Sequence, residues 1–250
     1  MRTASKAGAL AALALPLLLL SSIAKAGPSD YVHTPIVQQG EREIDFKAGT
    51  AKAEDGTRES AYSLGFGYGV THWWFTEFYA KWHKEPGLSS SFDAWEWENR
   101  FQLTETGKYP VDIGFLLEIE RPHDRSEGYE YVWGPLFQAD ITPLVQANLN
   151  LLVEKHIRTA TPSKAELGYQ WQVKYRQQSD FEYGLQGFGG AGPVSDLHLG
   201  SNQSHIAGPA VFGRLRAGRA EFIQYNAGLL FGLNHASPRT TLRVQAEYEF

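Results

Sequence analysis

The sequence ends in the ten residues TLRVQAEYEF, Thr241–Phe250, in which polar and apolar side chains alternate without exception. Successive side chains of a β-strand point to opposite faces, so this segment would have one charged face and one apolar face. The same period of two runs through residues 165–175, 111–119 and 149–153, with mismatches such as Leu116. The pattern predicts a protein built from strands that are apolar on one side.

Segments of this kind fill the chain after its first 26 residues, and no helical period competes with them. Each is long enough to cross a membrane as a tilted strand of roughly ten residues. The sequence therefore predicts an all-β fold, a transmembrane antiparallel up-and-down β-barrel of about twelve strands, as one domain over residues 27–250. The predicted strands are residues 41–51, 58–70, 73–84, 92–105, 110–121, 129–141, 144–157, 165–177, 180–189, 204–216, 219–233 and 239–250.

The links between the predicted strands fall into two classes. An even number of strands places both ends of the barrel on one side, which in an outer-membrane barrel is the periplasmic side. The links on that side are short, such as Thr71–His72 and Gln178–Ser179. Links on the other side, such as Lys84–Ser91 and Gly190–Gln203, are mostly longer and rich in Gly, Pro, Ser and charge. This division is typical of outer-membrane barrels.

Composition excludes several other classes of protein. The 250 residues include no cysteine, which excludes a disulfide scaffold, thiolate metal sites and thiol catalysis. The net charge of −5 argues against a nucleic-acid-binding protein, which needs a basic face. A mean hydropathy of −0.35 argues against a helical membrane bundle but agrees with a barrel, whose lumen and loops are polar.

Residues 1–26 have the features of a cleaved secretory signal peptide. Arg2 and Lys6 precede an apolar run of twelve residues, 9–20, and 24–26 (Ala-Lys-Ala) match a cleavage site. A transmembrane anchor is the alternative, but the run is short for one and Pro16 interrupts it. The mature chain would begin near Gly27. Loss of three basic residues and no acid would change its net charge from −5 to −8.

The C-terminus resembles the terminal signal by which outer-membrane barrels are recognised for insertion, with Tyr248 and Phe250 on the apolar face. A soluble sandwich or lipocalin-like barrel would also alternate, but with its apolar face inward. Aromatic residues near strand ends favour the membrane, because these rings prefer headgroup depth. We therefore predict localisation in the outer membrane, with its lipids, lipopolysaccharide and the barrel-assembly machinery as partners. The aromatic residues are Trp73, Trp74, Trp82, Trp95, Trp97, Tyr129, Tyr131, Trp133, Tyr175 and Tyr248.

The stretch Gly65-Phe66-Gly67-Tyr68-Gly69-Val70-Thr71, followed at once by an aromatic strand from Trp73, resembles the strand–turn–strand pattern of a broad family of outer-membrane barrels. That family is labelled putative phenol-degradation MetA-pathway, or transporter-like, barrels. The resemblance implies a barrel of twelve strands and passage of small molecules, aromatic or hydrophobic ones included.

With the apolar faces outward, many ionic side chains would surround a wet lumen, where they keep their solvation. These charges would form a field across a pore and orient solutes, or they would fill and rigidify a closed, non-conducting barrel. The resemblance favours a passive channel for small solutes, without a cofactor. The predicted pore-lining residues are Glu77, Lys81, Glu96, Glu98, Arg100, Glu118, Glu120, Glu154, Lys174, Arg176, Arg214, Arg216, Arg243 and Glu247.

Two other kinds of site are weighed against the channel. The longest outward link and its end contain a set that would suit a lipid-acting hydrolase, in which a Ser nucleophile needs a His base and an orienting partner. The set is Asp196, His198, Ser201, Asn202, Ser204 and His205. Loops are ordinarily rich in such residues, so we expect no catalytic residue there.

A metal site at the outer rim would require His83, Glu85, His123 and Asp124 to meet. No close histidine pair has ligand spacing on one strand, so we expect no metal.

Overall fold

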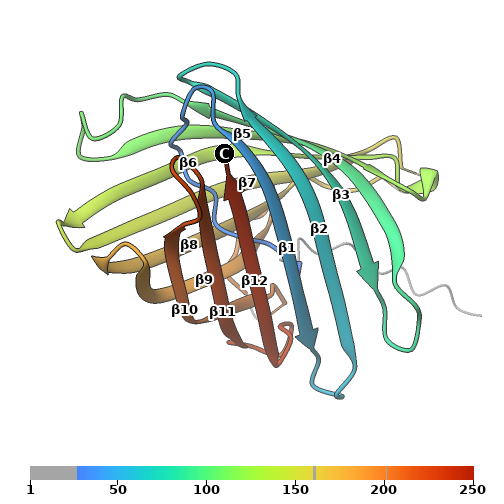
Figure 1. The fold of residues 1–250 in the computed structure, drawn as a ribbon. Coiled ribbons are helices and arrows are strands. Elements are labelled where there is room, and N and C mark those ends of the chain that lie inside the picture. The colour runs from blue at the N-terminus through green and yellow to red at the C-terminus, as the bar shows by residue number, and fades with distance from the viewer. Residues whose placement is uncertain (1–26, 160–161, 201) are drawn as a thin grey trace, which may run out of the picture.

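The computed structural model describes residues 27–159, 162–200 and 202–250, and the predicted signal peptide lies outside these residues. The described chain forms one closed barrel of antiparallel strands (Figure 1). A 3₁₀ helix, η1 (Arg125–Glu127), lies between the fifth and sixth strands. The strands are β1 (Arg42–Lys52), β2 (Arg58–Gly69), β3 (Trp74–Lys84), β4 (Ser91–Gln102), β5 (Asp112–Pro122), β6 (Tyr129–Thr142), β7 (Val145–Ile157), β8 (Glu166–Gln178), β9 (Phe181–Pro193), β10 (His205–Arg216), β11 (Phe222–Gly232) and β12 (Thr240–Glu249).

Each strand pairs with the next along the chain, and β12 pairs with β1 to close the ring. In that closing pair Ile44 lies opposite Tyr248, and the Phe250 amide donates to the Arg42 carbonyl over 2.9 Å. The twelve predicted strands are confirmed. The largest difference is β9, which continues to Pro193 and shortens the predicted 190–203 loop.

The apolar face of the strands points outward, as predicted. On β2 and β3 the Leu64 and Phe78 side chains are 50% and 59% exposed, whereas Glu77 is 1% exposed. A soluble barrel would show the reverse, so that alternative is wrong. The chain is a transmembrane barrel with an ionic interior. Exposed apolar side chains on the outside include Ile44, Phe46, Phe66, Trp95, Trp97, Leu149, Val173, Leu185, Leu229, Phe231, Leu242 and Val244.

Outward tryptophans have partners for their polar edges. Trp97 donates from Nε1 to Thr76 Oγ1 over 2.8 Å, and Trp74 donates from Nε1 to Asn99 Oδ1 over 3.0 Å. Trp74 is the first residue of β3, so its ring lies at one rim of the barrel. A rim ring with an apolar body and a satisfied polar edge suits the depth of the lipid headgroups. Trp97 is the seventh of twelve residues in β4, so the prediction that it lies near a strand end is wrong.

The interior is not uniformly polar. Leu116, the mismatch in the alternation of β5, points inward and packs with Leu136 and Leu152. A second interior cluster joins Val32 to Phe188, Ile206 and Leu230. Apolar side chains therefore fill part of the lumen, and charged and amide side chains line the remaining interior.

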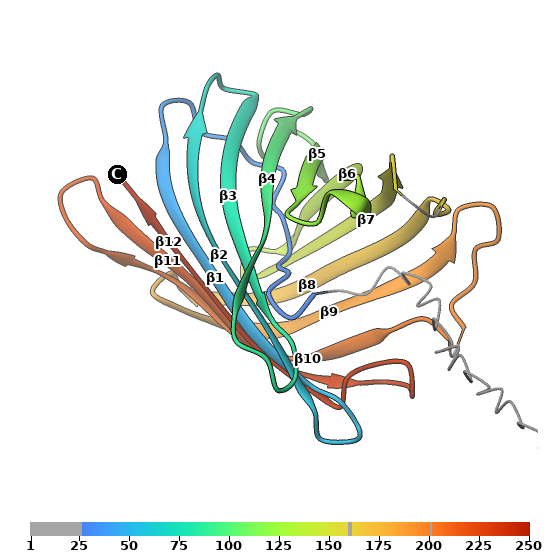
Figure 2. The same ribbon diagram turned by 90° about the vertical axis from the view of Figure 1, so that its right-hand side faces the viewer.

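The barrel has two distinct ends. At the end we call the turn end, β1 begins, β12 ends, and the links include 70–73, 143–144 and 179–180. At the opposite end, the loop end, the longest link is 194–204 (Figure 2). The turn end therefore corresponds to the side that the sequence predicts to be periplasmic.

Residues 27–159, 162–200 and 202–250 contain no helix with the length and hydropathy of a membrane span.

Glycines at alternate positions of β2 make room for aromatic rings inside the barrel. A Cβ at Gly65 would lie 2.4 Å from Tyr79 Cε1, and a Cβ at Gly67 would lie 2.4 Å from Phe75 Cζ. Both rings are 1% exposed. The Gly-x-Gly pattern thus has a packing cause: two large side chains of β3 lie over a bare stretch of β2.

Replacing Gly65 with Val is expected to lower the free energy of unfolding by about 1–3 kcal/mol, because the new side chain overlaps Tyr79 in a filled interior. Urea titration of the protein in lipid vesicles would measure the loss. Gly168→Val is the matched control, since a Cβ at Gly168 makes only ordinary contacts, at 3.6 Å and 3.8 Å. Equal effects of the two substitutions would contradict this explanation of the pattern.

Candidate functional site: the barrel lumen

A segment that precedes the first strand occupies the lumen. Residues 27–41, which we call the lumen segment, run inside the ring of strands before the chain enters β1 (Figure 1). Gly27 and Asp30 line a cavity toward the loop end, whereas Gln38 and Glu41 line one toward the turn end. The segment therefore follows the barrel axis from the loop-end half to the turn end.

The barrel wall has places that fit this segment. A Cβ at Gly49 would lie 1.7 Å from the Pro28 carbonyl oxygen, and a Cβ at Gly69 would lie 1.9 Å from the Gln38 carbonyl oxygen. Farther around the ring, on β5, a Cβ at Gly114 would lie 2.8 Å from Pro35 Cβ. Three strands thus leave out an inward side chain where the segment touches the wall, so its path is part of the packing.

Hydrogen bonds hold the segment along its length. The Tyr31 hydroxyl donates to Glu98 Oε2 over 3.0 Å, and Asn150 Nδ2 donates to the His33 carbonyl over 3.2 Å. Farther along, the Val37 amide donates to Gln102 Oε1 over 2.8 Å. Because the partners come from β4 and β7, the segment is fixed to well-separated parts of the wall.

Tyr31 contributes to a buried cation–π arrangement. Lys47 Nζ lies 3.7 Å from the ring centroids of both Tyr31 and Tyr79. Lys47 Nζ also lies 3.4 Å from Asp45 Oδ2, which accepts a hydrogen bond from the Tyr79 hydroxyl over 2.7 Å. A lysine between two aromatic faces is stabilised by their quadrupoles without losing its carboxylate partner. This contact attaches the segment to β1 and β3.

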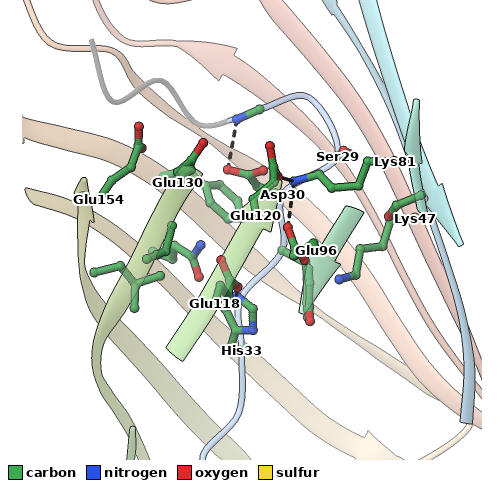
Figure 3. A pocket seen from close by; sticks show the side chains of 18 of the residues that line it. Ser29, Asp30, His33, Lys47, Lys81, Glu96, Glu118, Glu120, Glu130 and Glu154 are labelled. Carbon is green, nitrogen blue, oxygen red and sulfur yellow. Dashed lines mark hydrogen bonds and ion pairs between the residues drawn. The ribbon is translucent and has the colours of Figure 1, made fainter. Parts of the chain in front are cut away.

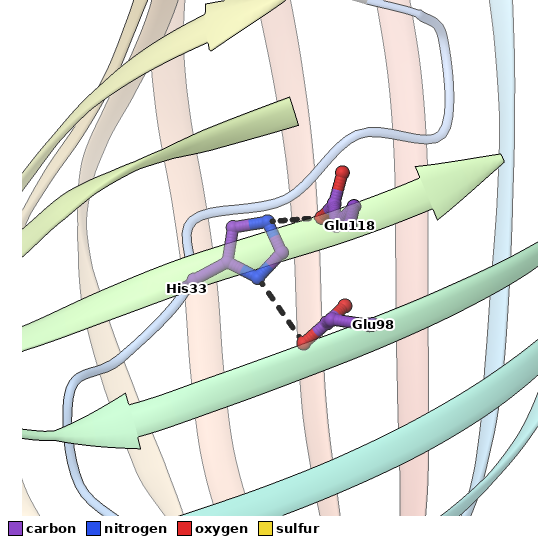
Figure 4. A group of neighbouring side chains, drawn as sticks. All are labelled: His33, Glu98 and Glu118. Atoms are coloured by element: carbon purple, nitrogen blue, oxygen red, sulfur yellow. Dashed lines mark ion pairs between the residues drawn. The ribbon is translucent and has the colours of Figure 1, made fainter. Parts of the chain in front are cut away.

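His33 lies between two carboxylates that face each other across β4 and β5 (Figure 4). Its Nδ1 is 3.6 Å from Glu98 Oε1, and its Nε2 is 3.4 Å from Glu118 Oε1. The imidazole is 4% exposed. Two like charges in a directly opposed pair repel each other, and the ring nitrogens of His33 lie between these two carboxylates.

Two cavities remain beside the segment. The loop-end cavity has a volume of about 320 Å³ (Figure 3), and the turn-end cavity has a volume of about 390 Å³. Tyr31 lines both, so this residue lies between the two cavities. At the turn end, burial raises the pKa of the Glu41 carboxyl, and the neighbouring Glu249 carboxylate raises it further.

The structure places most of the predicted pore-lining residues at these cavities. Glu77 and Glu98 are 1% exposed and Arg243 is 4% exposed, all three behind other interior groups. Arg216 is exposed at the turn end of β10. A role in conduction stays a prediction for all of them. Lys81, Glu96, Glu118, Glu120 and Glu154 line the loop-end cavity. Arg100, Lys174, Arg176, Arg214 and Glu247 line the turn-end cavity.

Sequence reasoning missed the lumen segment and its contacts with Lys47. The segment has no alternating pattern, because its surroundings are interior on every side. A signal was nevertheless present, since Gly49, Gly69 and Gly114 leave the inward face of three strands bare. Bare positions at separate strands indicate that something packs against them.

The loop residues considered for hydrolysis are dispersed. The His205 ring is 2.7 Å from the Tyr169 hydroxyl, His198 Nδ1 is 2.9 Å from the Asp196 carbonyl, and Ser204 Oγ donates to Ser237 Oγ. Among the residues described, no serine Oγ is hydrogen-bonded to a histidine ring. Ser201 lies outside the described residues.

The rim histidine considered for a metal, His83, is paired with Asp93 over 2.9 Å. The described residues instead contain two other groups with ligand-like spacing, His33–Glu98–Glu118 and Glu130–Glu154–His156.

Removing the His33 side chain is expected to loosen the lumen segment. The cysteine-free chain allows a single reporter thiol, Val32→Cys, at a position that is 5% exposed. In that background His33→Ala should speed maleimide labelling several-fold, because the contacts with Glu98 and Glu118 are lost. His123→Ala, on an exposed link at the loop end, is the control. Unchanged labelling after His33→Ala would show that His33 does not anchor the segment.

The structure is similar to solved structures of outer-membrane channels. With the KdgM porin in complex with disordered oligogalacturonate, the TM-score is 0.57 and the identity 12%, over 83% of this chain and 99% of that chain. With an outer-membrane channel from Pseudomonas putida F1, the TM-score is 0.58 and the identity 10%, over 90% of this chain and 100% of that chain. At these identities the likeness shows the fold.

The translocator domain of the autotransporter NalP from Neisseria meningitidis is also similar, with a TM-score of 0.53 and 9% identity, over 85% of this chain and 88% of that chain. The shared architecture thus occurs in proteins with different tasks. No model of a protein family matches the sequence, and no curated protein matches it. The resemblance to the phenol-degradation MetA-pathway family therefore stays a prediction.

Proposed function

We propose that this chain is a passive outer-membrane channel for small polar solutes, with the lumen segment as its constriction. The observation that carries the proposal is the interior itself. Charged cavities of about 320 Å³ and 390 Å³ lie toward the two ends of the lumen, and Tyr31 of the segment lines both. Cavities of this size hold small molecules and are too small for a folded protein chain.

The similarity to outer-membrane channels supports both the location and the class of function. In such a membrane the outward face would contact lipids and lipopolysaccharide. The barrel-assembly machinery would read the last strand with Tyr248 and Phe250, which are both partly exposed on the outer face.

The lumen also bears on which solutes pass. The resemblance to the MetA-pathway family favours aromatic or hydrophobic molecules, whereas the cavities are lined mainly by charged and polar side chains. Oligogalacturonate, which was bound to the KdgM porin, is a polymer of carboxylates. An acid-lined cavity would repel such a polyanion, so a solute of different charge is the better proposal here.

Planar-bilayer recording of the purified mature chain tests the proposal. Insertion should produce discrete current steps, and a small neutral or cationic solute added to one side should reduce them. A barrel that migrates as folded protein in gel electrophoresis but passes no current would instead be a non-conducting structural barrel. Hydrolysis of phospholipid vesicles by the same preparation would favour the lipid-acting enzyme.

A further inference from the structure

The two cavities differ in their balance of charge. Six acids and two lysines line the loop-end cavity, whereas five acids and four basic residues line the turn-end cavity. The excess of negative charge is therefore concentrated at one end of the lumen. The charged residues of the loop-end cavity are Asp30, Glu96, Glu118, Glu120, Glu130, Glu154, Lys47 and Lys81 (Figure 3).

The two lysines leave part of this charge uncompensated. Lys81 forms ion pairs with both Glu96 and Glu120. Lys47 pairs with Asp45 outside the cavity lining and lies between two aromatic rings. No lysine or arginine therefore pairs, within the described residues, with the remaining carboxylates on the adjacent strands β5, β6 and β7. These are Glu118, Glu130 and Glu154.

Imidazoles stand beside all three carboxylates. His156 Nε2 is 3.1 Å from Glu154 Oε1 and 3.7 Å from Glu130 Oε2, so one ring nitrogen faces carboxylates from two strands. His33 Nε2 is 3.4 Å from Glu118 Oε1. Carboxylate oxygens with an imidazole nitrogen at such spacing are a donor set for divalent cations, and the carboxylates alone suit ammonium groups.

A buried ring nitrogen without a hydrogen bond gives an independent indication. His33 is 4% exposed and lines the cavity, yet its Nδ1 makes no hydrogen bond, and the nearest carboxylate oxygen, Glu98 Oε1, is 3.6 Å away. A polar group that is buried without a hydrogen bond costs free energy. A charged ligand that rearranges the ring and its carboxylates would remove this cost, so the cost favours binding.

We propose that the loop-end cavity binds small cations, and that it makes the channel selective for them. This inference rests on the proposed channel function and names its class of solute. Glu118, Glu130 and Glu154 supply the charge on one wall, and the walls of low dielectric concentrate their field in the space between them. An alkylammonium group would use its N–H donors on these oxygens, whereas a divalent metal ion would also use His156.

Calorimetric titration of the detergent-solubilised mature chain with 1,4-diaminobutane and, separately, with Mn²⁺ tests the binding. Combined substitution Glu118→Gln, Glu130→Gln and Glu154→Gln should weaken binding by about tenfold or more, since charge-assisted contacts are lost. Glu54→Gln, Glu85→Gln and Glu105→Gln together are the matched control, because these three carboxylates are exposed on links outside the barrel. Glu154→Gln alone, with Glu154→Asp for rescue, serves if the triple variant does not fold.

The two sources of the cation are separated by His156→Ala. Loss of Mn²⁺ binding with retained diamine binding would assign a metal ion as the ligand. Loss of diamine binding in the carboxylate variants, with binding kept both in His156→Ala and in the matched control, would assign an amine as the ligand. Absence of binding for both probes, or equal weakening in the matched control, would overturn the proposal.

Selectivity in a bilayer is the second readout. In an asymmetric KCl gradient the wild-type reversal potential should have the sign of a cation-selective pore, and the triple carboxylate variant should move it toward zero. An anion-selective or unselective wild-type current would overturn the inference while leaving the channel function intact. Absence of any current would instead contradict the channel function, and the calorimetric result would still decide whether the cavity binds cations.

Discussion

Deleting residues 28–37 is expected to raise single-channel conductance several-fold and to join the two cavities into one passage. The deleted residues include Tyr31, which lines both cavities, and most of the contacts between the lumen segment and the wall. The barrel itself should persist, because all twelve strands begin after residue 41 and pair with one another around the closed ring. Conductance of the variant and of the wild type in the same planar bilayers gives the measurement.

The control for this deletion removes a comparable loop that touches neither cavity. Residues 195–199 belong to the link between β9 and β10 and line neither cavity. Their deletion should leave conductance near the wild-type value. If instead removal of residues 28–37 changes nothing, the lumen segment does not limit passage. A double substitution, Tyr31→Gly with His33→Ala, gives a smaller increase by the same reasoning and guards against misfolding of the deletion variant.

The strands were predictable because their pattern is local. Each one alternates within its own ten or so residues, and the lipid outside and the charged groups inside impose that alternation everywhere on the ring. Leu116 broke the pattern in the sequence, and in the structure it is an interior residue that packs with Leu136 and Leu152. The exception therefore marked a real feature, an apolar cluster inside the barrel.

The contents of the lumen depend on contacts between residues far apart in the chain. Tyr31 bonds to Glu98 and His33 to Asn150, across 67 and 117 positions, and no local period records such pairs. The same contacts bury Glu98, one of the predicted pore-lining residues, which is 1% exposed beneath the segment. Which inward charges face a cavity is decided by what fills the rest of the interior.

Replacing Leu64 with Arg is expected to destabilise the barrel by about 2–4 kcal/mol in lipid vesicles, the cost found for basic residues at the bilayer midplane. Leu64 is the seventh of twelve residues in β2 and is 50% exposed on the outer face. Its neighbours on the adjoining strands are Phe46 and Ala80, so no carboxylate lies opposite to compensate the new charge. Urea titration at several lipid compositions measures the free energy of unfolding.

Tyr68→Arg provides the comparison, because it adds the same side chain to the same face of the same strand, one residue from its turn end. Near the membrane interface the cost falls to about 0–1 kcal/mol, so the two variants should differ by a clear margin. The difference in unfolding free energy between the variants arises from the depth of each arginine in the bilayer. It is therefore expected only if lipid surrounds this face. A protein in water would accept Arg equally well at both exposed positions, so equal stabilities would place the apolar face in contact with something other than a bilayer.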